Sequence, residues 1–416
     1  MKRTYILYNV AAALALLTCA CSRSVGDGLA AAEDELSFSP ALTQSSTKTI
    51  FDSSVFPTDQ GAFSVSAVVL DGVKQTLYFF NKSVEYADSK WGFKADASGI
   101  RPRYYWPLAG GMNFYAFYPE SEVLTTRKIV PTTDPVTGET VAVPALAEGG
   151  IAYRNYTIKH SSDEAGGYVP ITSDADKNDS NLENAQLDFM SATQLYDDVS
   201  TRTSSSVPLL FMHNLAQIQF MAVPKRDLSV KATVGNGVTN FEVINHVSVT
   251  VDRIELMNIY STGSYYNIAP HWRDLKEKYN YFPLTCAEGQ GTELGYMDDE
   301  HKDDIGHRTP ERRIVTRNGL TEPARMLLIP QSLTDAKMKV WFSVRQKTVR
   351  NEGRENEFLV NDYLETYIRT IDMASLISEF KISTCVTFVF NIDLDDIDVS
   401  VSYGDWKSDG EITPVI

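Results

Sequence analysis

The sequence holds few of the residues that enzymes most often use as nucleophiles and general bases. Among its 416 residues there are four Cys and six His, and no two His stand at a spacing typical of a catalytic pair. The chain has no Gly-x-Ser-x-Gly turn, no His-Glu-x-x-His pattern and no phosphate-binding glycine loop. These absences argue against an enzyme. The sequence therefore predicts no catalytic residue and no cofactor.

Positive charge is also scarce. The chain has 38 Lys and Arg against 54 Asp and Glu, which leaves a formal net charge of −16 at pH 7. Phosphate groups would be repelled, so nucleic acid and an anionic membrane surface are excluded as main partners. The hydrophobic share of 43% is ordinary for a globular protein, and the length predicts two domains. Aromatic residues make up 11%, which favours strands over helices.

The apolar run near the start of the chain, residues 6–17, is too short to cross a bilayer, which takes about 20 apolar residues. Because the basic residues Lys2 and Arg3 precede this run, residues 1–20 are predicted to be a cleavable signal peptide.

A cysteine preceded by a small residue follows the apolar run. Ala20-Cys21 resembles a bacterial lipobox, so Cys21 is predicted to become the lipidated first residue, bearing palmitate, of the mature chain. The small, polar residues 21–35 would then form a tether to the outer membrane. The alternative is an ordinary signal peptide in which Cys19 and Cys21 are incidental.

Short alternating segments dominate the rest of the chain. They predict strands over Leu36–Ser39, Phe63–Ala67, Val207–Val223, Val247–Val251, Met338–Val344, Val386–Ile392 and Val399–Tyr403. With many strands and few helices, the pattern indicates an all-β chain of two tandem β-sandwich domains. The polar stretch around Gly235-Asn236-Gly237 places the boundary near 230, which gives domains at 36–230 and 231–416.

Two local patterns lead to more specific expectations. The aromatic segments Tyr104–Pro107 and Met112–Pro119 flank Gly110-Gly111, which predicts a hairpin with a Gly-Gly turn. The apolar residues of Ile371–Phe380 fall near helical spacing, so this segment is the best candidate for a helix.

Two acidic segments resemble metal sites only superficially. Asp174–Asp179 begins like a calcium loop, but Asp179 stands where Gly is needed and Ala185 where Glu is needed. Asp298–His307 offers carboxylate and imidazole groups in sequence, without a scaffold that would bring them together. Both segments are predicted to be solvated loops, and no metal site is expected.

Other residues leave alternatives open. Cys286 and Cys385 could pair in an exported protein or remain separate buried thiols. His213 is expected to be a hydrogen-bonded strand histidine rather than a catalyst. The aromatic residues 104–106 are expected to pack in the core, although an exposed cluster could stack on sugars.

Several motifs occur in an order and spacing that resemble a known family over nearly the whole chain. They are the lipobox at Cys21, then Leu36-Ser37-Phe38-Ser39, Thr47-Lys48-Thr49, Phe63-Ser64-Val65-Ser66-Ala67, Tyr105-Trp106-Pro107-Leu108, Phe114-Tyr115-Ala116-Phe117-Tyr118-Pro119, Leu210-Phe211-Met212-His213-Asn214-Leu215-Ala216 and Leu328-Ile329-Pro330-Gln331. Together they resemble the fimbrillin-like family of Bacteroides-type fimbrial subunits, in particular its minor-fimbrillin-like branch.

The resemblance implies two transthyretin-like β-sandwiches, made as an outer-membrane lipoprotein precursor that polymerises into surface fimbriae by strand exchange. In the family an arginine-specific protease cuts after the first strand, which here would be Leu36–Leu42. The cut would fall near Lys48, where lysine replaces the family's arginine; the alternative is that Lys48 is a solvated loop residue.

The resemblance also sets expectations for partners and role. Other fimbrial subunits would add a strand to this chain, and the Cys21 lipid would hold the precursor in the outer membrane. The tail from Trp406 to Ile416 is short and weakly apolar as a strand donor, so a tip or accessory subunit is as well supported as a stalk subunit. The alternative function is a monomeric surface lipoprotein that binds a glycan or a host protein.

Overall fold

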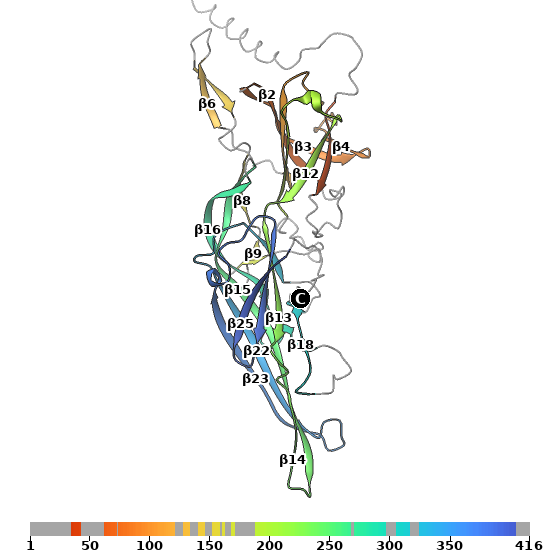
Figure 1. Ribbon diagram of the computed structural model, residues 1–416, viewed down its shortest axis with the longest axis vertical. Coiled ribbons are helices and arrows are strands. Elements are labelled where there is room, and N and C mark those ends of the chain that lie inside the picture. Colours follow the sequence, from red (N-terminus) through yellow and green to blue (C-terminus); the bar gives the residue numbers. More distant parts are fainter. Residues whose placement is uncertain are drawn as a thin grey trace, which may run out of the picture.

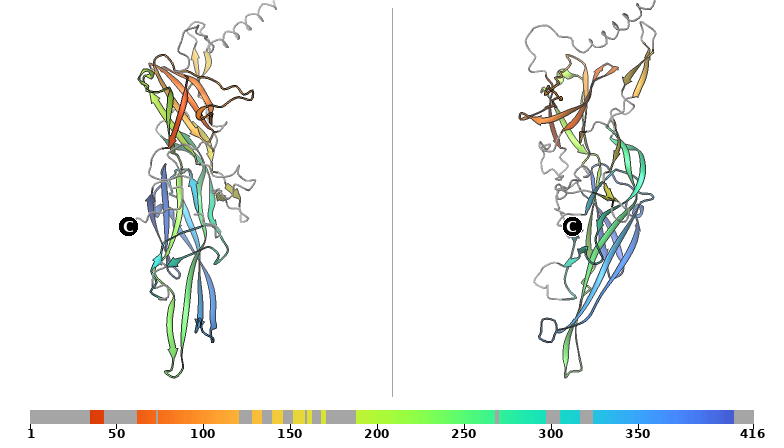
Figure 2. Two further views of the ribbon diagram at one scale, coloured as in Figure 1. Left: turned by 90° about the vertical axis from the view of Figure 1, so that its right-hand side faces the viewer. Right: turned by 180° about the vertical axis from the view of Figure 1, so that it is seen from behind.

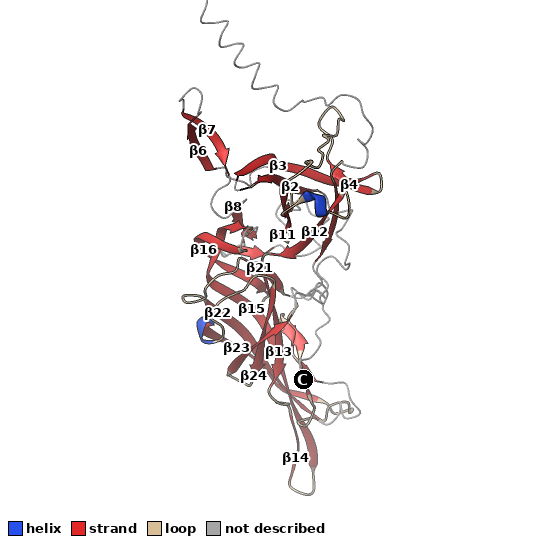
Figure 3. Cartoon of the chain, turned by 45° about the horizontal axis from the view of Figure 1, so that its top comes forward, coloured by secondary structure: helices blue, strands red, loops and turns tan. Residues whose placement is uncertain are grey.

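The protein is an elongated chain of strands with two parts joined end to end (Figure 1). The computed structural model describes residues 35–42, 62–72, 74–120, 128–133, 140–145, 152–158, 160–162, 168–170, 188–267, 270–296, 305–316 and 324–404. The all-β prediction is confirmed, because almost every element among these residues is a strand (Figure 3). No helix among them is long and apolar enough to cross a membrane.

The first part is a sheet that closes on itself into a barrel, in the order β1-β12-β11-β5-β2-β3-β4. Its strands are β1 (Ser37–Leu42), β2 (Phe63–Asp71), β3 (Lys74–Ala87), β4 (Lys90–Phe93), β5 (Gly111–Tyr118), β11 (Met190–Tyr196) and β12 (Ser206–His213). Side chains alternate between the interior and the outside, as on β12, where Val207, Leu209 and Phe211 are buried. A separate hairpin pairs β6 (Lys128–Thr133) with β7 (Thr140–Ala145).

The second part is a sandwich of two sheets, as predicted. The larger, nine-stranded sheet follows the path β23-β22-β15-β16-β10-β9, with β8, β14 and β17 also paired to it. These strands are β8 (Ala152–Thr157), β9 (His160–Ser162), β10 (Tyr168–Pro170), β14 (Val230–Gly235), β15 (Asn240–Tyr266), β16 (His271–Thr285), β17 (Thr292–Glu293), β22 (Lys337–Arg350) and β23 (Phe358–Asp372).

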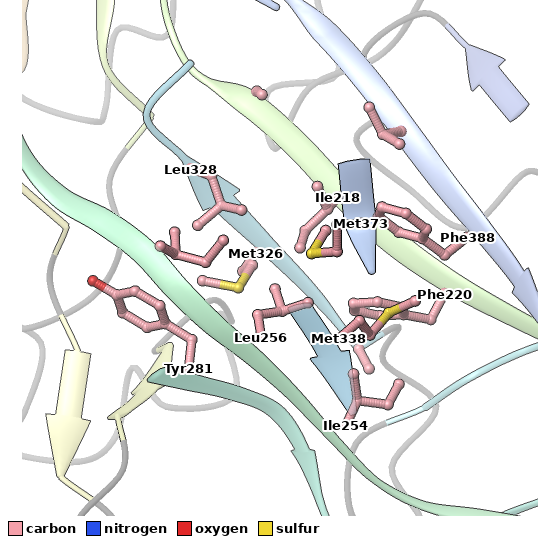
Figure 4. Packing of buried hydrophobic residues seen from close by; sticks show 14 of the residues in the cluster. Ile218, Phe220, Ile254, Leu256, Tyr281, Met326, Leu328, Met338, Met373 and Phe388 are labelled. Carbon is pink, nitrogen blue, oxygen red and sulfur yellow. The ribbon is translucent and has the colours of Figure 1, made fainter. Parts of the chain in front are cut away.

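The smaller sheet has five strands and follows the path β20-β13-β24-β25, with β21 paired to β13. Its strands are β13 (Ala216–Pro224), β20 (Arg313–Ile314), β21 (Arg325–Leu328), β24 (Thr384–Ile392) and β25 (Ile397–Gly404); β18 (Gly295–Tyr296) and β19 (Pro310–Glu311) form a separate pair. Ile218, Phe220 and Phe388 from this sheet meet Leu256 and Met338 from the larger one (Figure 4). Apolar burial between the sheets is the main stabilising term here.

The barrel and the sandwich meet end to end (Figure 2). The barrel interior has its own hydrophobic core, and the core of the sandwich extends to the barrel at the junction, where it includes Val68, Tyr115 and Phe117. Phe189, just before β11, lies in this junction and is fully buried. Its ring centroid lies 6.2 Å from Phe117 of the barrel, 4.4 Å from Tyr153, 5.3 Å from Tyr265 and 5.7 Å from Trp272. Because these aromatic rings interlock across the boundary, the junction is packed like a protein interior.

Several polar groups at the same junction are paired. His213 Nδ1 lies 2.5 Å from Asp188 Oδ2, and both side chains are almost fully buried. The Trp272 indole donates a hydrogen bond to the carbonyl of Asn214 at 2.8 Å. Burial raises the pKa of Tyr265 to about 12, and its contact with Ser191 opposes that rise only in part. The junction is therefore held by hydrogen bonds as well as by apolar packing.

The chain changes from barrel to sandwich over Asn214–Leu215, because β12 belongs to the barrel and β13 to the five-stranded sheet. This position is ahead of the boundary expected near 230. The earlier strands β8, β9 and β10 also pair with the nine-stranded sheet. The stretch before 214 thus contributes strands to both parts.

Two local predictions were wrong. The Gly110-Gly111 pair does not close a hairpin, because β5 pairs with β2 and β11. Glycine is required here for two other reasons. Gly110 has φ +84°, which favours glycine, and the backbone at Gly111 passes so close to β11 that a Cβ would lie 2.7 Å from the carbonyl oxygen of Tyr196. The predicted helix at 371–380 is the end of β23 followed by a single 3-10 turn, Met373–Ser375.

A partly buried ion pair fastens the loop before β19 to the segment just before β14. Arg308 donates to both carboxylate oxygens of Asp227, at 2.8 and 2.9 Å, and the backbone N–H groups of Ser229, Gly306 and Arg308 also donate to it. Burial alone would raise the pKa of Asp227, but these hydrogen bonds outweigh it and lower the pKa from 3.8 to about 2.

We expect this pair to make stability depend on pH. Because the pKa of Asp227 is lower in the folded state, its contribution is present above pH 3.8 and is lost as the pH falls toward 2. Between pH 5 and pH 2, the unfolding free energy should fall about 1–2 kcal/mol more in the wild type than in Asp227→Asn. Urea unfolding across this range measures it, with Asp335→Asn at an exposed pair as control. Parallel curves would contradict the assignment.

Candidate functional site

Strand β1 of the barrel has unequal support on its two sides. On one side it runs parallel to β12 over six residue pairs, from Ser37–Ser206 to Leu42–Phe211. On the other side its only pair with β4 is Phe38–Trp91. Backbone hydrogen bonding therefore holds β1 mainly through β12. The seam between β1 and β4 thus closes the barrel through a single ladder pair.

Side chains anchor β1 more firmly than its backbone does. Leu36, Phe38 and Leu42 are each less than 8% exposed, while Ser39 between them faces solvent. The Phe38 ring lies 5.2 Å from that of Phe93 and 6.1 Å from that of Phe63, both edge to face. Burying a side chain of this size contributes roughly 1.5–3 kcal/mol. The apolar row of β1 thus fills a continuous groove in the barrel.

Pro40 lies inside β1, although the sequence predicts that the strand stops there. A residue without an N–H group is tolerated because β1 has a single strand partner at this position. On the exposed face, Ser39 Oγ and Ser206 Oγ are 2.6 Å apart, which adds a side-chain link to the parallel ladder.

A cavity of about 300 Å³ lies beside the start of β1. Leu36 and Ser37 line one side of it, and Trp91 and Phe93 of β4 line the other. The space between β1 and β4 is therefore only partly filled. This cavity continues the groove that β1 occupies.

The groove that β1 fills could bind a strand of another chain. Without β1, strand β12 would present a row of unpaired N–H and C=O groups, and the pockets of Leu36, Phe38 and Leu42 would stand empty. An extended segment from another chain, with apolar side chains at every second position, matches that groove. The site is thus suited to binding a strand.

The two residues that the sequence singled out for modification, Cys21 and Lys48, lie outside the described residues, as does Asp174–Asp179. Of the segment 298–307, only residues 305–307 are described. No group of three or more His, Cys, Asp or Glu side chains that could hold a metal ion occurs in the described ranges.

The remaining predictions can be compared with the structure. His213 is a buried, hydrogen-bonded strand histidine, as expected. Trp106 is 5% exposed and its indole N–H donates to the carbonyl of Ser205, so the core interpretation is confirmed for it; Tyr105 is 38% exposed. No disulfide joins Cys286 and Cys385, which are separate thiols.

The sequence did not reveal the residues that line the groove beside β1. Trp91 and Phe93 stand on a four-residue strand that has too few residues to show a pattern. The alternation of Val207, Leu209 and Phe211 was a usable signal for a strand, but it does not reveal β1 as the partner.

No family model and no curated protein matches the chain. Solved structures do. It is similar to a candidate cell adhesion protein from Bacteroides uniformis, at 12% identity and a TM-score of 0.39, covering 91% of this chain and 100% of that one. A candidate cell adhesion protein from Bacteroides ovatus has 14% identity, a TM-score of 0.39 and the same coverage. The fimbrial anchor protein Mfa2 from Porphyromonas gingivalis has 9% identity and a TM-score of 0.28, covering 89% and 97%.

Proposed function

We propose that this chain is a subunit of a cell-surface fimbria that supports adhesion and assembles by exchange of β1 for a strand of another subunit. The observation that carries the proposal is the construction of the β1 seam. One short strand fills an apolar groove, with a full ladder on the β12 side and a single pair on the β4 side. A strand held in this way can be replaced by another of similar pattern without rebuilding the rest of the barrel.

The proposal includes export as an outer-membrane lipoprotein precursor with its lipid on Cys21. Proteolysis near Lys48 would then separate β1 and the lipid from the rest of the chain. After that cut, β1 would be held by noncovalent contacts alone, so a partner strand at high local concentration could displace it. As a tip or accessory subunit, the protein would need only to accept a strand and not to donate one.

The N-terminal sequence of the protein recovered from outer membranes and surface filaments tests this proposal. We expect two forms, one blocked by lipid at Cys21 and one that begins near Thr49. Lys48→Ala should remove the second form, and Lys90→Ala, at an exposed position of β4, should leave it in place. A lipid-blocked chain with no shortened form would instead favour a monomeric surface lipoprotein that binds a glycan or a host protein.

Strand addition has its own measurement. Surface filaments that contain the shortened form should run on gels as ladders that collapse on boiling, because strand exchange holds the subunits without covalent bonds. If purified filaments lack the protein altogether, a structural role in the fimbria is ruled out.

A further inference from the structure

Strand β23 forms a long open edge of the nine-stranded sheet. It pairs with β22 from Lys337–Asp372 to Arg350–Phe358, and within the described part of the chain no strand pairs with its other side. The first eight of its fifteen residues are all exposed. Every second residue along that edge therefore points its N–H and C=O groups away from the sheet.

The edge is also unusually apolar for a surface strand. The side chains exposed by 41–62% are Phe358, Leu359, Val360, Tyr363, Leu364 and Ile368. Natural proteins protect open edges with prolines, lysines, bulges or short strands. The β23 segment has neither proline nor lysine, and its one bulge lies near its start, opposite Thr348 and Val349. Such an edge is expected to be covered by another strand.

Charged side chains on β23 have hydrogen-bond partners within the chain itself. Arg345 donates to both carboxylate oxygens of Asp362, at 2.8 and 2.6 Å. The Tyr367 hydroxyl donates to Glu365 at 2.8 Å. Arg369 donates to the carbonyl of Asp395. The edge therefore offers an incoming chain apolar contact and backbone pairing, and its charged side chains already have polar partners.

We propose that two copies of this protein join through their β23 edges, antiparallel about a twofold axis at Leu364. In this register Leu364 faces its own copy, Val360 faces Ile368, and Asp362 faces Thr366. A twofold axis normal to the sheet pairs residues that share a face, so the axis can move only by whole residues. Moving it to Glu365 would oppose that carboxylate to itself, and moving it to Tyr363 would oppose the charged Asp362 to the apolar Leu364. The register at Leu364 is favoured because it opposes no like charges and pairs aliphatic residues with each other.

A second copy suits this edge because the pairing is self-complementary and closed. Each β23 covers the other, so no further edge remains on that side and assembly stops at two. The groove of β1 lies in the barrel, on different strands, so this pairing does not depend on strand exchange there.

Disulfide trapping tests the register. Cells that express the full-length Leu364→Cys chain should give a covalent dimer on non-reducing gels, because the two thiols face each other. Leu108→Cys, at a 99% exposed position in the barrel, is the matched control and should give none. Absence of a dimer from Leu364→Cys, or an equal yield from both variants, would overturn the proposal.

Native mass spectrometry of the detergent-solubilised full-length protein tests the dimer itself. The wild type should show twice the mass of one chain. Leu364→Lys places two lysines opposite each other and should raise the dissociation constant at least about tenfold. Leu195→Lys, at a 56% exposed barrel position, should leave it unchanged, with thermal melting to show that both variants fold. A monomeric wild type, or equal dissociation constants for both variants, would refute the pairing.

Discussion

Phe38→Ala is expected to destabilise the barrel by about 3–5 kcal/mol. The ring is 4% exposed and lies within 6.5 Å of Phe63, Phe93 and Phe114, so its removal leaves a cavity that edge-to-face neighbours cannot fill without moving. Equilibrium denaturation of the full chain, followed by tryptophan fluorescence, measures the loss, since Trp91 and Trp106 lie in the barrel core.

The matched control for this change is Ser39→Ala on the opposite face of the same strand. It removes the contact with Ser206 and should cost within about 1 kcal/mol. Phe38→Ala should also make the proposed strand exchange easier, because a less tightly held β1 leaves its groove more readily. Equal losses of unfolding free energy in Phe38→Ala and Ser39→Ala would show that the buried ring does not anchor β1. The pocket of Phe38 would then not be a main binding position in the groove of β1.

Phe189→Ala should have an effect of comparable size, about 3–5 kcal/mol, at a different place. This ring joins Phe117 of the barrel to Tyr153, Tyr265 and Trp272 of the sandwich. Its loss should uncouple the two parts, so that one cooperative unfolding transition becomes two. Differential scanning calorimetry would record the split.

Leu195→Ala serves as the control for the junction, since this residue lies on nearby β11 but is 56% exposed. It should change the unfolding free energy by less than about 0.5 kcal/mol and leave the shape of the transition as it was. A single transition in Phe189→Ala would show that the barrel and the sandwich do not depend on this ring for their coupling.

Much of the fold was predictable because period-two alternation marks half-buried strands wherever a sheet has one face in the core. Leu36, Phe38, Val207 and Leu209 all follow this pattern and all are buried. Their pairing was not predictable, because Ser39 and Ser206 are 167 residues apart in sequence and alternation carries no information on which strand lies alongside.

The wrong predictions have specific causes. Met373, Ile377 and Phe380 are buried at a spacing close to helical, yet they come from one 3-10 turn and an extended return in which Gln331 and Phe380 exchange backbone hydrogen bonds. Apolar spacing over ten residues cannot separate these cases. The glycines at 110 and 111 were correctly seen as special, but a close backbone approach, and not a hairpin, requires them.

The packed core at the junction has a mechanical consequence. Asn214–Leu215 is all that separates β12 from β13, and interlocked rings surround this link, so the molecule has no hinge there. A pulling force on a strand bound in the barrel would be transmitted to the sandwich through the packed side chains of the junction. It would not be taken up by the extension of a flexible linker. If a strand of another subunit binds in the barrel as proposed, the rigid junction would set the direction in which that subunit points.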